Sequence, residues 1–217
     1  SPNYNQSVFE KILEPQNYPL GRFPSKTEFA LSFMQQVAVN LTIGYDNSNM
    51  RSVNGPPGTG KTTLLKDIFA ELVVKQAHDI CLLTSKYIKG NEDTLYYGKA
   101  SIGELTDKIA ENNIVVASSN NGAVQNIVNE LPLKEGIDDN ILPELEKADY
   151  FKDIANADMK EERFWGTFSL EGGKAENMTN ILNKIECIVK YLDEEYKSDS
   201  EIYNKFKKQY EYVSDLR

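Results

Sequence analysis

The chain has 217 residues, of which 40% are hydrophobic and 26% are charged, and its formal net charge at pH 7 is −9. These values indicate a globular protein with its own core, and no apolar run approaches the roughly 18 residues that a membrane span needs. Two cysteines and the single His78 exclude a disulfide framework, a His/Cys zinc site and a histidine-based triad. Because the start of the chain has no basic and apolar signal segment, we expect a cytoplasmic protein outside any membrane.

The negative charge is concentrated in the second part of the chain. Residues 1–133 carry a net charge of −2, whereas residues 134–217 carry −7. The overall charge therefore argues against a protein that coats nucleic acid, but the nearly neutral first part leaves room for a local basic groove. The sequence predicts two domains with these boundaries.

The first elements can be predicted in chain order. Prolines and a glycine indicate an irregular leader up to residue 24. Residues 25–28, Ser-Lys-Thr-Glu, have the spacing of a capping box and predict a helix that ends at Gly44. We then expect a short strand over residues 50–54, a glycine-rich loop, and an amphipathic helix over residues 62–77.

Two short apolar runs, residues 80–83 and 114–117, are typical of strands that are buried on both faces of a sheet. Between them the pattern predicts an exposed hairpin that turns at residues 90–93. A helix after Gly122 would continue the alternation of strands and helices. The sequence therefore predicts an α/β fold, a parallel sheet flanked by helices.

The last part of the chain has a helical pattern. Apolar side chains over residues 178–213 recur at alternating steps of four and three, which is a heptad seam broken at Asp199. Since residues 198–201 can cap a second helix, one rod and a broken pair of helices both remain open. Residues 187–194 end in Asp-Glu but belong to the seam, so we expect a helix there. We predict a coiled-coil-like arm over residues 134–217, whose seam pairs with another segment or with a second copy.

Residues 55–62, Gly-Pro-Pro-Gly-Thr-Gly-Lys-Thr, match the phosphate-loop pattern G-x-x-x-x-G-K-[ST] at every position. The glycines let backbone N–H groups surround phosphate oxygens, and the dipole of the following helix favours the same anion. Lys61 would bind phosphate oxygens and the Thr62 hydroxyl would bind magnesium, so both are candidate catalytic residues. The predicted ligands are ATP and Mg²⁺. The residues expected to contact ATP here are Gly55, Pro56, Pro57, Gly58, Thr59, Gly60, Lys61, Thr62 and Thr63.

Residues 35–39, Gln-Gln-Val-Ala-Val, precede the loop and resemble Q-x-x-A-V, the Q motif of superfamily 1 helicases. In that family the glutamine contacts the adenine base, and Gln35 is the matching residue. A side-chain amide offers a donor and an acceptor together, as the adenine edge requires. The resemblance therefore adds Gln35 to the expected nucleotide contacts.

Residues 116–127 resemble motif Ia of the same superfamily, where a turn after a strand contacts the backbone of single-stranded DNA or RNA. Ser119, Asn120 and Asn121 are the matching candidates, because hydroxyls, amides and a helix N-terminus bind phosphates without reading sequence. The three motifs occur in helicase order over about residues 20–133. The chain thus resembles superfamily 1 helicases of the RNA-decay and Dna2-type group.

The resemblance implies that residues 1–133 are the first part of a RecA-like P-loop ATPase domain, which couples ATP hydrolysis to movement along a single strand. It also implies a Walker B strand and a second RecA-like domain as partners within a longer protein. Neither is recognisable here, so we expect this chain to be inactive alone. Two other interpretations remain open: an AAA-type ATPase that remodels proteins, and a coiled-coil interaction module with a vestigial nucleotide site.

Overall fold

The computed structural model describes residues 5–44, 50–56, 58–85, 90–95, 98–103, 105–197 and 199–217. The chain divides into two compact units. The first unit consists of Ser1–Phe23, Phe33–Val115 and Ser200–Arg217. The second unit consists of Pro24–Ser32 and Val116–Asp199.

Helices dominate both units. The first unit contains α1 (Gln6–Ile12), a 3-10 turn at Pro15–Asn17, α2 (Phe33–Ile43), α3 (Lys61–Cys81), β1 (Gly90–Leu95), β2 (Gly98–Gly103), α4 (Asp107–Ala110) and α9 (Ile202–Asp215). The second unit contains 3-10 turns at Thr27–Phe29 and Lys134–Gly136, with α5 (Asn121–Glu130), α6 (Leu142–Ala148), α7 (Lys152–Asn156) and α8 (Ala175–Glu194).

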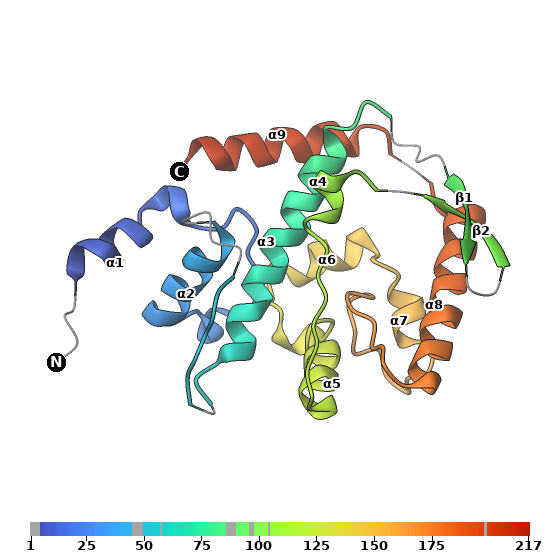
Figure 1. The fold of residues 1–217 in the computed structure, drawn as a ribbon, viewed down its shortest axis with the longest axis horizontal. Coiled ribbons are helices and arrows are strands. Elements are labelled where there is room, and N and C mark those ends of the chain that lie inside the picture. Colours follow the sequence, from blue (N-terminus) through green and yellow to red (C-terminus); the bar gives the residue numbers. More distant parts are fainter. Residues whose placement is uncertain are drawn as a thin grey trace. The chain divides into compact units, whose positions relative to one another are not determined.

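Helix α3 is the centre of the first unit, and it contacts α2, α4 and α9 (Figure 1). Its Leu64, Ile68 and Phe69 side chains are buried, as the predicted amphipathic pattern requires. Near its C-terminal end, His78 stacks on Tyr210 of α9 with ring centroids 3.8 Å apart. The predicted helix is therefore present, and one of its faces forms the core of this unit.

Two buried carboxylates on α3 hold the segment that precedes α2. Glu71 accepts a hydrogen bond of 2.7 Å from the Gly21 N–H. Asp67 accepts one of 2.8 Å from the Phe23 N–H, and its carboxylate also pairs with Arg22 at 3.1 Å. Because Asp67 and Glu71 are four residues apart, they lie one turn apart on the same helix face. Together they fix residues 21–23 along α3.

The core of the second unit forms around Trp165, which is 6% exposed. Its indole N–H donates to the Leu131 carbonyl at 3.1 Å, and its backbone N–H donates to the Pro132 carbonyl at 2.9 Å. Gly166 lies so close to the backbone of Tyr150 that a Cβ atom would collide with it. These contacts join α7 and the segment before α8 to the end of α5.

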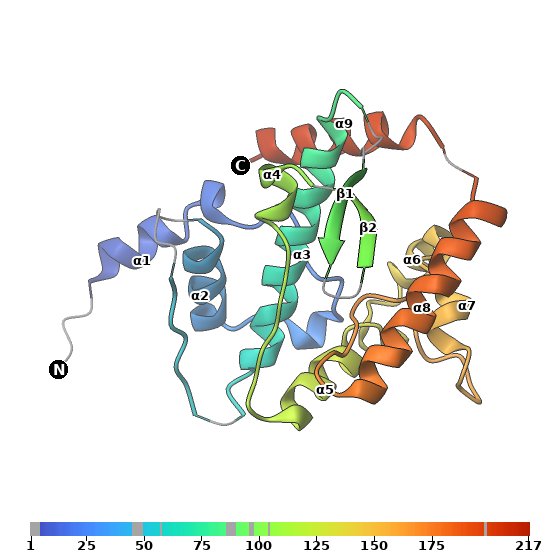
Figure 2. The same ribbon diagram turned by 45° about the vertical axis from the view of Figure 1, so that its right-hand side comes forward.

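The predicted parallel sheet was wrong. In the described residues the only paired strands are β1 and β2, which form an antiparallel hairpin (Figure 2). Residues 80 and 81 continue α3, because no glycine or proline interrupts residues 61–81. Residues 50–54 and 114–117 join no ladder. A parallel strand needs hydrogen bonds from a neighbouring strand, which an apolar run cannot supply by itself.

Two predicted boundaries also differ from the structure. The helix expected from residue 25 begins at Phe33, because Ala30 has an extended conformation (φ −56°, ψ 144°) after the turn at Thr27–Phe29. It ends at Ile43, so Gly44 stops it as predicted. The hairpin does not turn at residues 90–93, which lie within β1. Its expected flanks at residues 86–88, 96 and 97 fall outside the described residues.

The arm is a broken pair of helices, α8 and α9, rather than one rod. Residues 187–194 are helical, as expected from the seam. The leader also differs from the prediction, because it contains the short helix α1. In the described part of the chain, no helix is both long and apolar enough to cross a membrane.

We expect Glu71→Ala to lower the free energy of unfolding by about 1–3 kcal/mol, because the buried Gly21 N–H loses its acceptor. Urea unfolding followed by circular dichroism measures the change. Glu211→Ala is the matched control, since it removes an exposed carboxylate that pairs with Lys207 on α9, and it should cost less than about 0.5 kcal/mol. Equal losses in the two variants would contradict the stabilising role of Glu71.

Candidate functional site

The glycine-rich loop leads directly into α3, whose first residue is Lys61. Gly58 and Gly60 have φ angles of +81° and +71°, in the left-handed region that favours glycine. Gly60 is also the N-cap of α3, and it has no side chain to accept the first N–H groups of the helix. These N–H groups are therefore available to an anion at the start of α3.

Side chains of the loop donate to its own carbonyl groups. The Lys61 ammonium donates to the Gly55 oxygen at 2.7 Å and to the Pro56 oxygen at 2.8 Å. The Thr59 hydroxyl also donates to the Pro56 oxygen, at 2.8 Å. Lys61 thus reaches back across the loop, and an ammonium group in this place is a suitable donor to phosphate oxygens.

The structure places Gln35 beside the loop. Its side-chain amide, on the first turn of α2, donates to the carbonyls of Thr59 and Gly60, each at 3.1 Å. A Cβ atom on Gly60 would collide with this amide, so the close approach itself requires glycine. Two motifs that are separate in the sequence therefore meet here, and the side-chain oxygen of Gln35 is not used in these two bonds.

A polar network positions α2 against the segment before it. Arg22 donates to the Gln36 oxygen at 3.3 Å, and Gln36 donates to the Asn40 oxygen at 2.7 Å. Asn40 is fully buried and donates to the Ile12 carbonyl at 2.9 Å. Since Arg22 also pairs with Asp67, this network links α2 to α3 and holds Gln35 next to the loop.

Sequence analysis did not identify Arg22 or Asp67 as part of this site. The sequence contains only a weak indication of them. Asp67 and Glu71 lie within the apolar pattern of α3, and acids that are buried in this way require partners. Nothing in the sequence indicates which segment supplies those partners.

The remaining predicted loop residues are less informative. Thr62 and Thr63 lie in the first turn of α3 and are partly buried. Pro57 lies outside the described residues. Among the residues that the structure describes, no group of three or more His, Cys, Asp or Glu side chains could hold a metal ion. The magnesium contact of the Thr62 hydroxyl stays a prediction.

The turn that resembles motif Ia begins α5 in the second unit. Asn120 is the N-cap, and its side-chain oxygen accepts a hydrogen bond of 3.0 Å from the Gly122 N–H. The Asn120 N–H donates in turn to the Ser118 hydroxyl at 3.0 Å. Ser119 is exposed, and Asn121 is the first residue of α5. These residues are brought together with one another, while the phosphate loop belongs to the first unit.

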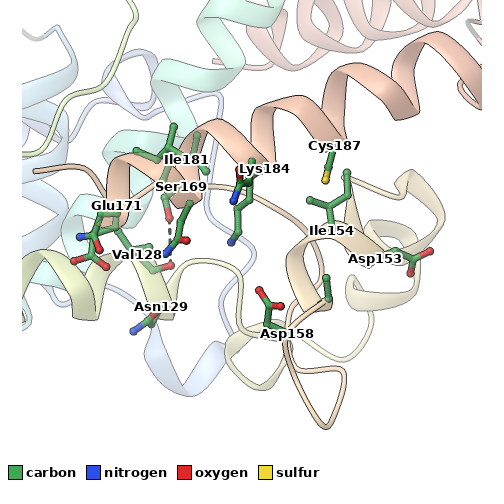
Figure 3. Close-up of a pocket in the computed structure, with 15 residues that line it drawn as sticks. Val128, Asn129, Asp153, Ile154, Asp158, Ser169, Glu171, Ile181, Lys184 and Cys187 are labelled. Carbon is green, nitrogen blue, oxygen red and sulfur yellow. Dashed lines mark hydrogen bonds between the residues drawn. The ribbon is translucent and has the colours of Figure 1, made fainter. Parts of the chain in front are cut away.

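A separate cavity of about 700 Å³ lies within the second unit, between α5, α7 and α8 (Figure 3). Lys184 and Asp158 point toward one another across it, and Glu171 and Asn129 also line it. No residue that the motifs predict belongs to this cavity. Its mixture of both charge signs and several amides does not define one class of ligand.

The comparison with protein families identifies the class of this protein. A family model described as an AAA domain matches residues 32–202, which is most of the chain, so the chain belongs to this family. The domain is found in superfamily 1 helicase-like P-loop NTPases, a class that binds nucleotides, usually with Mg²⁺. No curated protein and no solved structure matched the chain.

We expect Gly60→Ala to lower the free energy of unfolding by about 1–2 kcal/mol, because alanine is strained at a φ of +71°. The added methyl group would also displace the Gln35 amide. Gly172→Ala is the control, since no atom lies within 4 Å of its new Cβ, and it should leave stability unchanged or slightly raised. Urea unfolding of both variants tests this. A Gly60→Ala protein as stable as the unchanged chain would contradict the left-handed conformation of Gly60.

Proposed function

We propose that this chain binds Mg-ATP at residues 55–62 and is the nucleotide-binding part of a superfamily 1 helicase-like ATPase that moves along single-stranded nucleic acid. The observation that carries the proposal is the contact between Gln35 and the loop. It puts the candidate for adenine recognition next to the candidate for phosphate binding. The family match supports the general class.

The loop residues suit a nucleoside triphosphate. In this proposal the γ- and β-phosphates lie at the start of α3, where Lys61 exchanges its two carbonyl acceptors for phosphate oxygens. The Thr62 hydroxyl binds Mg²⁺, which neutralises phosphate charge. Gln35 turns its amide from the loop carbonyls toward the adenine edge, or uses its side-chain oxygen to accept from the adenine amino group.

The nucleic-acid contact belongs to the turn before α5. The helix begins at Asn121, so the positive end of its dipole and the exposed Ser119 hydroxyl are suited to backbone phosphates of either DNA or RNA. These contacts would be independent of base sequence, as a protein that moves along a strand requires. We propose the RNA-decay and Dna2-type group as the branch on the same motifs.

The two other interpretations have less support. The AAA domain found here occurs in helicase-like NTPases, which favours the helicase class over protein remodelling. A dimeric coiled coil through residues 178–213 would need one continuous seam. The structure instead has two helices, α8 and α9, and Tyr210 of α9 already stacks on His78 of α3.

Titration with fluorescent Mg-ATP tests the phosphate site. We expect Lys61→Ala to weaken binding about 10- to 100-fold, because a charged hydrogen-bond donor to phosphate is lost. Lys174→Ala is the control, since it removes a lysine at the start of another long helix, α8, where Lys174 is the N-cap and lies outside the loop. Equal binding by the two variants would place the nucleotide elsewhere.

The same titration with GTP separates base recognition from phosphate binding. Gln35→Leu should bring the ratio of ATP to GTP affinity toward one. Because both nucleotides share the triphosphate, this ratio cancels any effect of the lost hydrogen bonds to Thr59 and Gly60. An unchanged preference for ATP would exclude Gln35 as the adenine contact while leaving the phosphate site intact.

Asn120→Asp tests the nucleic-acid contact. Aspartate keeps the oxygen that caps α5 but adds a negative charge, so we expect fluorescent oligo-dT and oligo-U to bind at least about threefold more weakly. Asn126→Asp makes the same change at an exposed position within α5 and should have little effect. Oligonucleotides that bind both variants as well as the unchanged chain would contradict this placement.

A further inference from the structure

Helix α8 has two different sides. On one side Tyr191 packs edge-on against Phe151, with ring centroids 5.9 Å apart, and donates to the Asp149 carboxylate at 3.2 Å. Partial burial and the Asp149 charge raise the pKa of Tyr191, so its hydroxyl remains a donor. Helix α7 lies beside α8 in both ribbon views (Figures 1 and 2).

The other side is an exposed apolar stripe. Its five members alternate at steps of four and three residues, and each is between 42% and 58% exposed. At 1.5 Å per residue the stripe extends for about 21 Å along α8. Contiguous apolar surface of this length is unusual on a protein that does not bind a partner there. The α8 stripe consists of Met178, Leu182, Ile185, Val189 and Leu192.

The two flanks of the α8 stripe differ in charge and accessibility. Ile181 and Ile188 are on the flank toward α7 and are partly buried. Glu186 and Asp193 are on the free flank, and both are exposed. The nearby Lys190 pairs with Glu194 at 3.9 Å. A partner helix would therefore meet an apolar surface with an acidic edge.

This charge pattern disfavours a second copy of α8 as the occupant. An antiparallel pair of α8 helices would bring Glu186 and Asp193 against the same acids of the other copy. A parallel pair would direct the acids at the flank of Ile181 and Ile188, which faces α7. Like charges across a helix interface weaken association and select against that pairing.

We propose that the α8 stripe binds an amphipathic helix of a partner protein, in which an apolar stripe is flanked by lysine or arginine residues. The apolar residues would fill the stripe, and the basic residues would pair with Glu186 and Asp193. This interaction does not depend on the nucleotide or on the loop at residues 55–62.

Two designed 21-residue helical peptides test the proposal. Each has leucine at the two seam positions of every seven residues, and the positions on either side of the seam are all lysine in one peptide and all glutamate in the other. We expect fluorescence anisotropy to show the lysine peptide binding at least about tenfold more tightly than the glutamate peptide. Replacing Glu186 and Asp193 together with lysine should reverse this preference. Equal affinity of the two peptides for the unchanged chain would overturn the proposal.

A second pair of variants distinguishes the stripe from general attraction to an acidic protein. Leu182→Gln with Val189→Gln should abolish binding of the lysine peptide, and both positions are exposed, so the fold should not change. Ile202→Gln with Tyr212→Gln, at exposed positions on α9, is the matched control and should bind normally. Binding unaffected by the α8 changes would overturn the proposal. A dimer in sedimentation that these changes dissociate would identify a second copy as the occupant and overturn it too.

Discussion

The first unit depends on two carboxylates that are buried on one face of α3. Asp67 and Glu71 are 6% and 2% exposed, and a buried charge is unfavourable unless it is paired and hydrogen-bonded. Backbone N–H groups of residues 21 and 23, together with Arg22 and Lys75, satisfy these requirements. Residues 21–23 therefore cannot shift along α3 without leaving a buried carboxylate unpaired.

The buried carboxylates on α3 also affect the candidate nucleotide site. Arg22 contacts both Asp67 and Gln36, and Gln36 donates to the buried Asn40. These contacts fix the position of α2 relative to α3. One residue before Gln36, Gln35 then contacts the carbonyls of the loop. A set of ordinary polar contacts thus places the side chain proposed to recognise the base beside the backbone proposed to hold the phosphates.

Some predictions that rested on local chemistry agree with the structure, although the capping box at residues 25–28 begins no α-helix there. The predicted parallel sheet, which rested on distant partners, is absent from the described residues. The loop glycines have positive φ angles, and α3 follows them, because both features depend on neighbouring residues. The helix after Gly122 is present as α5 for the same reason. In contrast, the apolar runs at residues 80–83 and 114–117 were expected to be strands, and neither one pairs with a strand.

The sequence by itself determined the phosphate-loop pattern, the long helix that follows it, and the apolar stripe of α8. These features are set by the residue types within one segment and by helical periodicity. Only the tertiary structure decided that Gln35 meets the loop, that Arg22 joins α2 to α3, and that α8 and α9 separate. The physical reason is that a buried polar group needs a partner, and the partners of Glu71 and Asp67 are 50 and 44 residues away in the chain.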